Sequence, residues 1–411
     1  MRKHISRVGL GLVAALVATV AVAAPTATAK PTGAKATTVR IWADNDRFNA
    51  VSKVANAWAA ARGVQVDVVK KQFGNLRTDL STVQADSAPD LLMAASDWTG
   101  ELAANGLIVQ LFPRAALKKQ FPNYALAAVS YGRLYGTPVA LENIGLVVNT
   151  KLAKVPKTFA AFEKEALAFK RKSADNLALA IPQGSGGDPY HMYPFFSGLC
   201  GYVFGTSKSG ALNKHKLGIA APAFLKNAPL IDKWNREGLI NSKIDYNTGK
   251  AAFLAGKAAF WMTGPWEADT LKKSGLSYRI IQLPKIKCRA RPFLGVQAFM
   301  VTKYAGTHGV ATVAKDFVSN YMMTSAAQRA FYVVNGRPPA NSLAAKRISD
   351  PVLAQFNKAG VGGTPLPNIP EMASVWSEWG SAWIKSTKGA GATKARAAFT
   401  TAARNIRAKI G

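Results

Sequence analysis

Hydrophobic and polar positions follow two different periods along the chain from about residue 38 onward. Residues 38–43 form a β-rich run, and apolar residues from Val51 to Ala61 then recur at helical spacing. Gly63 ends this helix, and residues 64–69 supply a second strand. A strand, a helix and a strand in this order predict a parallel sheet covered by helices. The predicted fold class is therefore α/β.

The same alternation continues to the end of the chain. Further strands are predicted at residues 90–95, 144–149, 177–182, 258–263, 278–283 and 293–302. Helices are predicted at residues 158–171, 222–236, 311–323 and 394–410. Pro229 is expected to break or kink the second of these helices, because proline lacks the N–H that a helix interior needs. A chain of 411 residues with 49% hydrophobic residues is too long for one ordinary core, so two lobes are expected.

The first residues have the composition of an export signal. Arg2, Lys3 and Arg7 precede an uncharged run over residues 9–24, and small residues follow. This pattern predicts a signal peptide at residues 1–29 and a flexible linker at residues 30–37. The alternative is a membrane anchor, but the apolar run is shorter than the roughly 20 residues that span a bilayer. The segment has no cysteine for lipid attachment. From the signal pattern we expect an exported protein in the periplasm or at the outer face of the membrane or cell wall.

The net charge of +31 suggests anionic surroundings, such as a cell envelope, or an anionic ligand, or nucleic acid. The basic residues are spread widely, apart from a short stretch that contains Lys285, Lys287, Arg289 and Arg291. Zinc-finger spacing, RNP-like stretches and basic zippers are absent from the sequence, so no nucleic-acid partner is expected. The high charge is therefore interpreted as an adaptation to the envelope.

The chain has only two cysteines, Cys200 and Cys288. An even pair in an exported chain is compatible with one disulfide. Two free thiols are equally compatible with the sequence, so both alternatives stay open at this stage.

The motifs of common enzyme classes are missing from the sequence. The 4 histidines are isolated, and no His-Glu-x-x-His, Gly-x-Ser-x-Gly or Walker motif occurs. No glycine fingerprint for a dinucleotide lies between a strand and a helix. We therefore expect no cofactor, no metal and no catalytic residue. A glycosidase remains an alternative, because it needs only two carboxylates a few ångströms apart.

Acidic and aromatic residues stand at the ends of predicted strands, where open α/β sheets bind ligands. Asp46 and Arg47 follow the first strand, Asp97 follows the strand at residues 90–95, and Glu142 follows Pro138. Carboxylates accept hydrogen bonds from sugar hydroxyls, and aromatic faces cover the apolar face of a sugar ring. This mixture predicts a sugar site. The alternative for Asp97 is that it caps the helix after it.

A series of segments, in the same order along the chain, resembles the maltose/maltodextrin-binding proteins of the extracellular solute-binding family 1. The most specific segment is residues 251–266, AAFLAGKAAFWMTGPW, which ends in Gly-Pro-Trp. The other segments are Ile41-Trp42 with Asp46-Arg47, residues 89–92 with 105–107, residues 138–149, and residues 366–372 followed by Trp376. The resemblance runs from about Val39 to the C-terminus.

The resemblance implies a two-lobed periplasmic-binding-protein-like fold of type II, with discontinuous lobes and a hinge. Residues 38–142 and 294–345 would form lobe 1, and residues 143–293 and 346–411 would form lobe 2. It also implies a carbohydrate ligand, an oligosaccharide of the maltose or maltodextrin type, held in a cleft between the lobes by hinge closure. The implied partner is the membrane permease of an ABC importer, and the protein would act as a monomer without enzymatic activity.

The resemblance also assigns roles to residues of the site. Asp46, Arg47, Asp97 and Glu142 match residues that bind sugar hydroxyls, and Tyr190 matches a tyrosine that contacts a sugar ring. Trp266 and Trp376 match the two stacking tryptophans, although both are also compatible with core packing.

The sequence departs from the maltose binders at three positions of the site. The departures are Ala94 in place of a tryptophan, Gly380 in place of an arginine and Ser377 in place of a tyrosine. The stacking platform is therefore expected to be smaller on at least one side than in maltose binders. A binder of an anionic solute, such as a sugar acid or glycerol phosphate, is the remaining alternative, although the carboxylates would repel a phosphate.

Overall fold

A computed structural model describes residues 37–112 and 117–411 of the protein. The predicted signal peptide, and the predicted linker except for residue 37, lie outside the described residues. Within the described ranges, no helix is both long and apolar enough to cross a membrane.

The larger sheet contains the predicted βαβ unit. β1 (Thr38–Asp44) pairs in parallel with β2 (Gln65–Lys71) and with β3 (Leu91–Ala95), and α1 (Phe48–Arg62) connects the first two strands. Gly63 ends α1 in the left-handed conformation, with φ 64°, as the sequence predicts. β12 (Phe293–Val301) runs antiparallel to β3 and to β6 (Gly136–Glu142). The prediction of parallel strands therefore holds for β1 to β3 and for the short pair of β12 with β13 (Thr364–Pro365).

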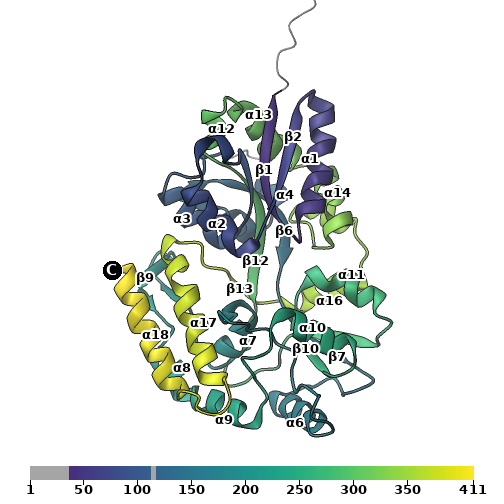
Figure 1. Ribbon diagram of the computed structural model, residues 1–411, viewed down its shortest axis with the longest axis vertical. Coiled ribbons are helices and arrows are strands. Elements are labelled where there is room, and N and C mark those ends of the chain that lie inside the picture. Colours follow the sequence, from purple (N-terminus) through teal and green to yellow (C-terminus); the bar gives the residue numbers. More distant parts are fainter. Residues whose placement is uncertain (1–36, 113–116) are drawn as a thin grey trace, which may run out of the picture. The chain divides into compact units, whose positions relative to one another are not determined.

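Both faces of this sheet are covered by helices, which Figure 1 shows on either side of β1 and β12. Side chains of consecutive strand residues point to opposite faces. Ile41 therefore packs into the core cluster that includes residues of α1 and α14 (Ser325–Asn335), whereas Trp42 packs into the cluster on the α2 (Phe73–Thr82) side. Trp42 is a core residue, as expected.

The smaller sheet is antiparallel throughout. β7 (Gly145–Asn149) lies between β10 (Phe260–Thr263) and β11 (Tyr278–Ile281). The predicted strand at residues 177–182 is wrong, because this segment forms only isolated bridges, from Leu177 and Ala180 to residues beside and within β10. Pro182 has no N–H with which to continue the ladder.

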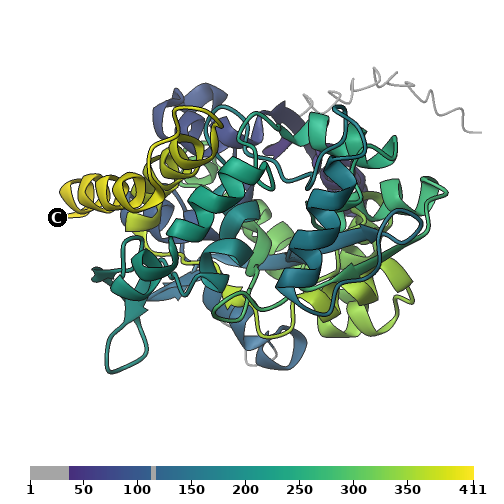
Figure 2. The same cartoon turned by 90° about the horizontal axis from the view of Figure 1, so that it is seen from below.

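Helices surround the smaller sheet, and the three that the sequence predicts here, at residues 158–171, 222–236 and 394–410, begin and end within one residue of the predicted positions. α6 (Phe159–Lys170) is capped by Thr158, whose hydroxyl accepts a 3.1 Å hydrogen bond from the backbone N–H of Ala161. Pro229 divides its predicted helix into α8 (Pro222–Asn227) and α9 (Pro229–Glu237), which confirms the expected break. α17 (Ala373–Thr387) packs against α18 (Ala395–Ile410), and Figures 1 and 2 both show the two helices together at the C-terminal end of the chain.

One predicted helix is shorter than the sequence indicates. α13 (Ala311–Asp316) ends early, and a π-helical turn, Phe317–Tyr321, continues the chain. The remaining helices are α3 (Thr99–Ala104), α4 (Leu117–Gln120), α5 (Asn123–Ala128), α7 (Pro189–Gly198), α10 (Tyr246–Leu254), α11 (Ala268–Lys273), α12 (Tyr304–Thr307), α15 (Ser342–Lys346) and α16 (Pro351–Ala359). The remaining strands are β4 (Ser130–Tyr131), β5 (Arg133–Leu134), β8 (Phe204–Thr206) and β9 (Leu212–Leu217).

A disulfide joins the only two cysteines of the chain. Cys200 follows α7 and Cys288 lies in the loop between β11 and β12, with 5.2 Å between their Cα atoms. The choice between a disulfide and two thiols, which the sequence leaves open, is therefore decided in favour of the disulfide.

The two sheets define two α/β lobes, and the chain passes between them more than once. It leaves the larger sheet after Glu142 at the end of β6, returns to it with β12 and leaves again after α15, and β13 then pairs with the first residues of β12. The boundaries predicted for the two lobes fall in or next to these connections, and they stay predictions.

Candidate functional site

Glu142, the last residue of β6, is held by two donors in a nearly buried position. Its Oε1 accepts a 2.7 Å hydrogen bond from Gln297 Nε2, and its Oε2 accepts a 2.9 Å hydrogen bond from Arg337 Nε. Only 10% of the Glu142 side chain and 4% of the Arg337 side chain are exposed. A charge-assisted pair with so little water around it has a well-defined geometry. Glu142 is therefore a rigid part of the site.

Asp46 and Arg47 follow β1, but their side chains differ in environment. The Arg47 guanidinium pairs with Asp44 in a nearly buried contact and lies over the ring of Phe73 at 5.1 Å. Asp46, by contrast, has a side chain that is 68% exposed, and its carboxylate lies 3.6 Å from Arg337 Nη2. Asp46 is thus free to accept hydrogen bonds from a ligand, whereas Arg47 is engaged in holding Asp44.

Arg337 joins the predicted acids, and the sequence reasoning missed it. It stands between Gly336 and Pro338 in the turn after α14, and its guanidinium contacts Glu142 and Asp46. It also lies 5.6 Å from the ring centre of Trp266. The only signal in the sequence is a single basic residue in a turn rich in glycine and proline. Such turns are common, so this signal is too weak to identify a site residue.

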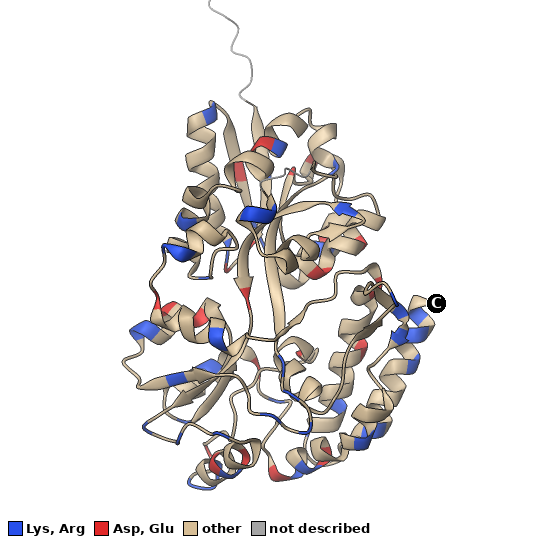
Figure 3. Ribbon diagram, turned by 180° about the vertical axis from the view of Figure 1, so that it is seen from behind, with Lys and Arg blue, Asp and Glu red and all other residues tan. Residues whose placement is uncertain are grey.

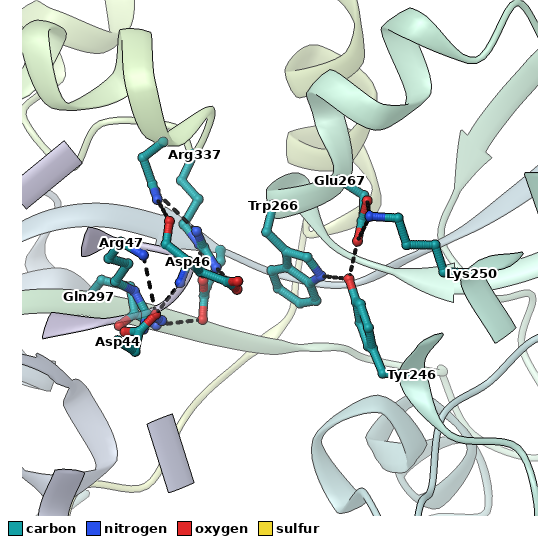
Figure 4. A network of polar contacts seen from close by, with 11 residues as sticks. Asp44, Asp46, Arg47, Tyr246, Lys250, Trp266, Glu267, Gln297 and Arg337 are labelled. Carbon is teal, nitrogen blue, oxygen red and sulfur yellow. Dashed lines mark hydrogen bonds and ion pairs between the residues drawn. The ribbon is translucent and has the colours of Figure 1, made fainter. Parts of the chain in front are cut away.

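Trp266 follows β10 in a short 3-10 turn and is braced from one side. Its indole Nε1–H donates a 2.6 Å hydrogen bond to Tyr246 Oη, and the Tyr246 hydroxyl in turn donates to Glu267. Lys250 pairs with the same carboxylate at 2.8 Å. Figure 4 shows Trp266 with these three residues on one side and with Arg337, Asp46 and Gln297 on the other. The orientation of the indole plane is therefore set before any ligand arrives.

Gly264, two residues before Trp266, allows this ring to lie close to the backbone. A Cβ atom on Gly264 would come within 2.3 Å of the Trp266 ring, which no real contact tolerates. The Gly-Pro-Trp sequence thus has a steric reason: glycine leaves room for the indole that follows it.

Trp376, in the first turn of α17, contacts Asp97 from the other lobe. Its Nε1–H donates a 3.0 Å hydrogen bond to Asp97 Oδ2. Asp97 does not cap the helix after it, since α3 begins at Thr99 without a side-chain cap. Burial raises the pKa of Asp97 from 3.8 to about 6, and the hydrogen bond from Trp376 and the charge of Arg77 offset part of this effect.

The raised pKa of Asp97 predicts a specific pH dependence of stability. The folded protein binds this proton more tightly than the unfolded chain, so the contribution of Asp97 to the free energy of unfolding falls as the pH rises from about 4 to about 6. The loss amounts to at most about 3 kcal/mol, at about 1.4 kcal/mol per pKa unit. Asp97→Asn keeps an oxygen acceptor for Trp376 and cannot ionise.

We therefore expect the Asp97→Asn variant to gain stability over the wild type as the pH rises through this window. Urea unfolding of both proteins at pH 4, 5, 6 and 7 measures the difference. A difference that is constant across these pH values would contradict the raised pKa. The comparison with the wild type at each pH removes the contributions of the other carboxylates.

Tyr190, in the first turn of α7, connects the two tryptophans through a row of aromatic rings. Its ring centre lies 6.3 Å from that of Trp266 and 6.0 Å from that of Phe293, and Phe293 lies 6.3 Å from Trp376. The Tyr190 hydroxyl is buried and has no hydrogen-bond partner among the described residues. Burial, followed by the charge of Glu142, raises its pKa, so the hydroxyl stays protonated. It is a donor and acceptor ready for a ligand group.

The structure therefore brings the predicted residues together. Asp46 and Glu142 meet at Arg337, Glu142 and Tyr190 both approach Gly295, and Tyr190 leads to Trp266 on one side and to Trp376 on the other. Asp97 closes the series through Trp376. Arg47 does not join this series, because its guanidinium pairs with Asp44 and lies over the ring of Phe73.

The departures from the maltose binders also have structural reasons. A Cβ atom on Gly380 would come within 2.3 Å of the carbonyl oxygen of Gly186, so no arginine fits there without a shift of the backbone. Ala94 is fully buried, in the same core cluster as Trp98. In the described part of the chain, no group of His, Cys, Asp and Glu side chains is arranged to hold a metal ion.

The fold and the site define a class of binding protein with two α/β lobes. The family model for bacterial extracellular solute-binding proteins matches residues 53–357, and the chain belongs to this family. The family is extracellular, so the protein is exported, and its relatives are solute-binding proteins rather than enzymes.

Characterised relatives are similar over most of their length. The galactooligosaccharide-binding protein of Bacillus subtilis is 26% identical over 83% of this chain and 82% of its own. The maltodextrin-binding protein of the same organism is 29% identical over 80% of this chain and 79% of its own. The structure is similar to that of the Thermus thermophilus maltotriose-binding protein bound with maltotriose, with a TM-score of 0.80, 27% identity, and coverage of 91% of this chain and 100% of that one.

Proposed function

We propose that this chain is the carbohydrate-binding component of an ABC importer and that it captures an oligosaccharide between its two lobes. One observation carries the proposal: hydrogen-bonding oxygens from one lobe and aromatic faces from the other meet in one continuous set of contacts, from Asp46 to Trp376. The relatives with maltodextrin, maltotriose and galactooligosaccharide in their names support the same class of ligand. The protein works at the outer face of the membrane as a monomer and delivers its ligand to a permease.

The proposed site divides the work between polar and aromatic residues. Asp46 and Glu142 accept hydrogen bonds from sugar hydroxyls, and the Tyr190 hydroxyl adds a further partner. The indole of Trp266 covers a ring face on one side and Trp376 covers one on the other. Arg337 keeps Asp46 and Glu142 in place and limits their mutual repulsion.

Contacts between the lobes explain how a ligand favours the closed form. Trp376 of one lobe donates to Asp97 of the other, and Trp266 lies beside Arg337. A sugar that touches both walls binds more tightly when they are close together, so it shifts the population toward closure. The permease recognises the closed form.

Binding of an anionic solute and glycosidase activity both have less support from the residues of the site. An anionic solute would need a free cation, but Arg47 and Arg337 are both paired with carboxylates. A glycosidase needs one carboxyl group that donates a proton and a second that attacks or activates water. Both oxygens of Glu142 are instead occupied by Gln297 and Arg337. We therefore propose binding without catalysis.

Titration calorimetry against a panel of sugars tests the proposal. Maltose, maltotriose, longer maltodextrins and galactooligosaccharides are titrated into the protein, together with glucose and glycerol phosphate. We expect saturable binding of at least one oligosaccharide and none of glycerol phosphate. Chromatography of the sugars after incubation should show no shorter products. Tight binding of glycerol phosphate alone, or cleavage of an oligosaccharide, would overturn the proposal.

Replacement of Trp266 tests the stacking role. We expect Trp266→Ala to weaken the affinity for the best sugar by at least about tenfold, because the variant loses the apolar face that covers the sugar ring, and tenfold corresponds to about 1.4 kcal/mol. Trp266→Phe keeps an aromatic face but loses the hydrogen bond to Tyr246, and it should retain most of the affinity. Unchanged affinity in the alanine variant, with an unchanged melting temperature, would count against stacking.

A further inference from the structure

Most of the excess positive charge of the protein belongs to the predicted lobe 2. The ranges 143–293 and 346–411 contain 33 Lys and Arg against 12 Asp and Glu. The ranges 38–142 and 294–345 contain 15 Lys and Arg against 10 Asp and Glu. Figure 3 shows this difference as blue segments spread over the lower lobe, including α18 beside the C-terminus. The charge is therefore localised, which a general adaptation of the surface does not explain.

The disulfide connects two stretches that contain no acidic residue, the first within lobe 2 and the second running from lobe 2 into the part of lobe 1 that contains β12. Cys200 lies in the stretch from Pro189 to Ile231, and Cys288 lies in the stretch from Thr270 to Lys315, and neither stretch contains Asp or Glu. The loop between β11 and β12 carries four basic residues of the second stretch at alternate positions. We call residues 285–291 the basic loop.

The basic loop is anchored by its uncharged residues and exposes its charged ones. The backbone N–H groups of Lys287 and Cys288 both donate to the carbonyl of Gly198, at 2.9 and 2.8 Å. Ile286 packs on Gly198 and Ala290 is fully buried, whereas all four basic side chains, of Lys285, Lys287, Arg289 and Arg291, are exposed. A loop held by a disulfide and by its own backbone presents these charges without the cost of ordering it on binding.

The four cations of the loop have no carboxylate partner within the described residues. Arg289 donates only to the carbonyl of Val361 and to Gln282. Unpaired cations on a fixed loop create a local positive potential that attracts anions. The site for sugar lies elsewhere, around Glu142 and Trp266, so the proposed function leaves this surface without a role.

We propose that the basic loop binds a linear phosphodiester polymer of the cell envelope and so keeps the protein near its importer. The chemistry of the loop favours this partner. A protein interface needs an apolar core with aromatic anchors, and a surface that enters a lipid bilayer needs exposed apolar side chains beside its cations. The apolar residues of the basic loop point inward instead. Val361, to whose carbonyl Arg289 donates, is an exposed apolar residue in contact with these cations, and alone it is too little for insertion into a bilayer. Lysine and arginine side chains on a fixed loop match phosphate groups along a hydrated chain.

Binding of poly(glycerol phosphate) to the full chain tests this proposal. The triple variant Lys285→Gln, Lys287→Gln, Arg291→Gln removes three charges but keeps Arg289, which supports the loop at residue 361. The matched control Lys151→Gln, Lys154→Gln, Lys157→Gln removes three exposed charges from another surface of the same lobe. At 50 mM salt we expect the triple variant to bind at least about tenfold more weakly, with a salt dependence (log K against log salt) that is shallower by about 2. The control should bind as the wild type does.

Each other outcome contradicts the proposal. An equal loss in the control would mean that net charge alone attracts the polymer. Tighter binding of the wild type to phosphatidylglycerol vesicles than to the polymer would assign the loop to a membrane surface. No measurable binding of the polymer by the wild type would exclude the interaction. Sugar titrations of the same variants keep this test separate from the proposed function, since both variants should bind sugar as the wild type does.

Discussion

Loss of the disulfide is expected to lower the free energy of unfolding by about 4–5 kcal/mol. Cys200 and Cys288 are 88 residues apart in sequence, so their bond closes a long loop in the unfolded chain. The bond reduces the conformational freedom of the unfolded chain far more than that of the folded one. Urea unfolding of the Cys200→Ser, Cys288→Ser double variant against the wild type, without reductant, measures the loss.

The double variant also serves as the control for chemical reduction. Dithiothreitol should destabilise the wild type by a similar amount and leave the double variant unchanged. Cys200 has φ 70°, a left-handed conformation that costs about 1 kcal/mol for residues other than glycine. Cys200→Gly combined with Cys288→Ser is therefore expected to lose about 1 kcal/mol less than the double serine variant. A loss below about 1 kcal/mol for the serine variant would contradict the role of the loop closure.

Replacement of Arg337 is expected to lower the free energy of unfolding by about 3–5 kcal/mol, the usual effect when one partner of a buried ion pair is removed. In Arg337→Met, the nearly buried carboxylate of Glu142 would keep only its hydrogen bond from Gln297. Asp46 would also lose the nearby positive charge. The affinity for sugar should fall, because the side chains of Asp46 and Glu142 would no longer be held in place. Unfolding by urea and titration with the best sugar measure the two effects.

Two further variants separate these effects. Arg329→Met removes an exposed arginine from the same helix region and should change stability by less than about 0.5 kcal/mol. Arg337→Met combined with Glu142→Leu removes both charges, so most of the stability should return. Sugar affinity should stay low in that double variant, because Glu142 itself contacts the sugar in the proposed site. Recovery of affinity together with stability would show that neither residue touches the ligand.

Arg337 and Arg47 together explain how three acidic residues can lie close together in one site without destabilising the lobe. Asp44, Asp46 and Glu142 all lie close together, and two guanidinium groups are placed among them. Arg47 is committed to Asp44, and Arg337 bridges the other two. The proposed sugar site is thus nearly neutral, although the protein as a whole is strongly basic. This separation supports an uncharged ligand in the site and an anionic partner elsewhere.

Much of the fold follows from local patterns in the sequence. The strand, helix and strand from β1 to β2, the end of α1 at Gly63 and the break at Pro229 all depend on neighbours within a few residues. The segment at residues 177–182 was predicted wrongly, because an apolar run does not by itself determine whether a partner strand continues beside it. The antiparallel pairing of β12 with β3 also depends on residues far apart in sequence.

Local features of the sequence suffice to identify the residue types of the proposed sugar site, namely the acidic and aromatic residues at strand ends and the segment that ends at Trp266. How these residues are arranged depends on the folded chain. It turned Arg47 toward Asp44, connected Asp97 with Trp376, and placed Arg337 beside Glu142, 195 positions away in sequence. It also paired Cys200 with Cys288. The physical reason is that ion pairs, ring contacts and disulfides depend on distances in space, which local propensities do not determine.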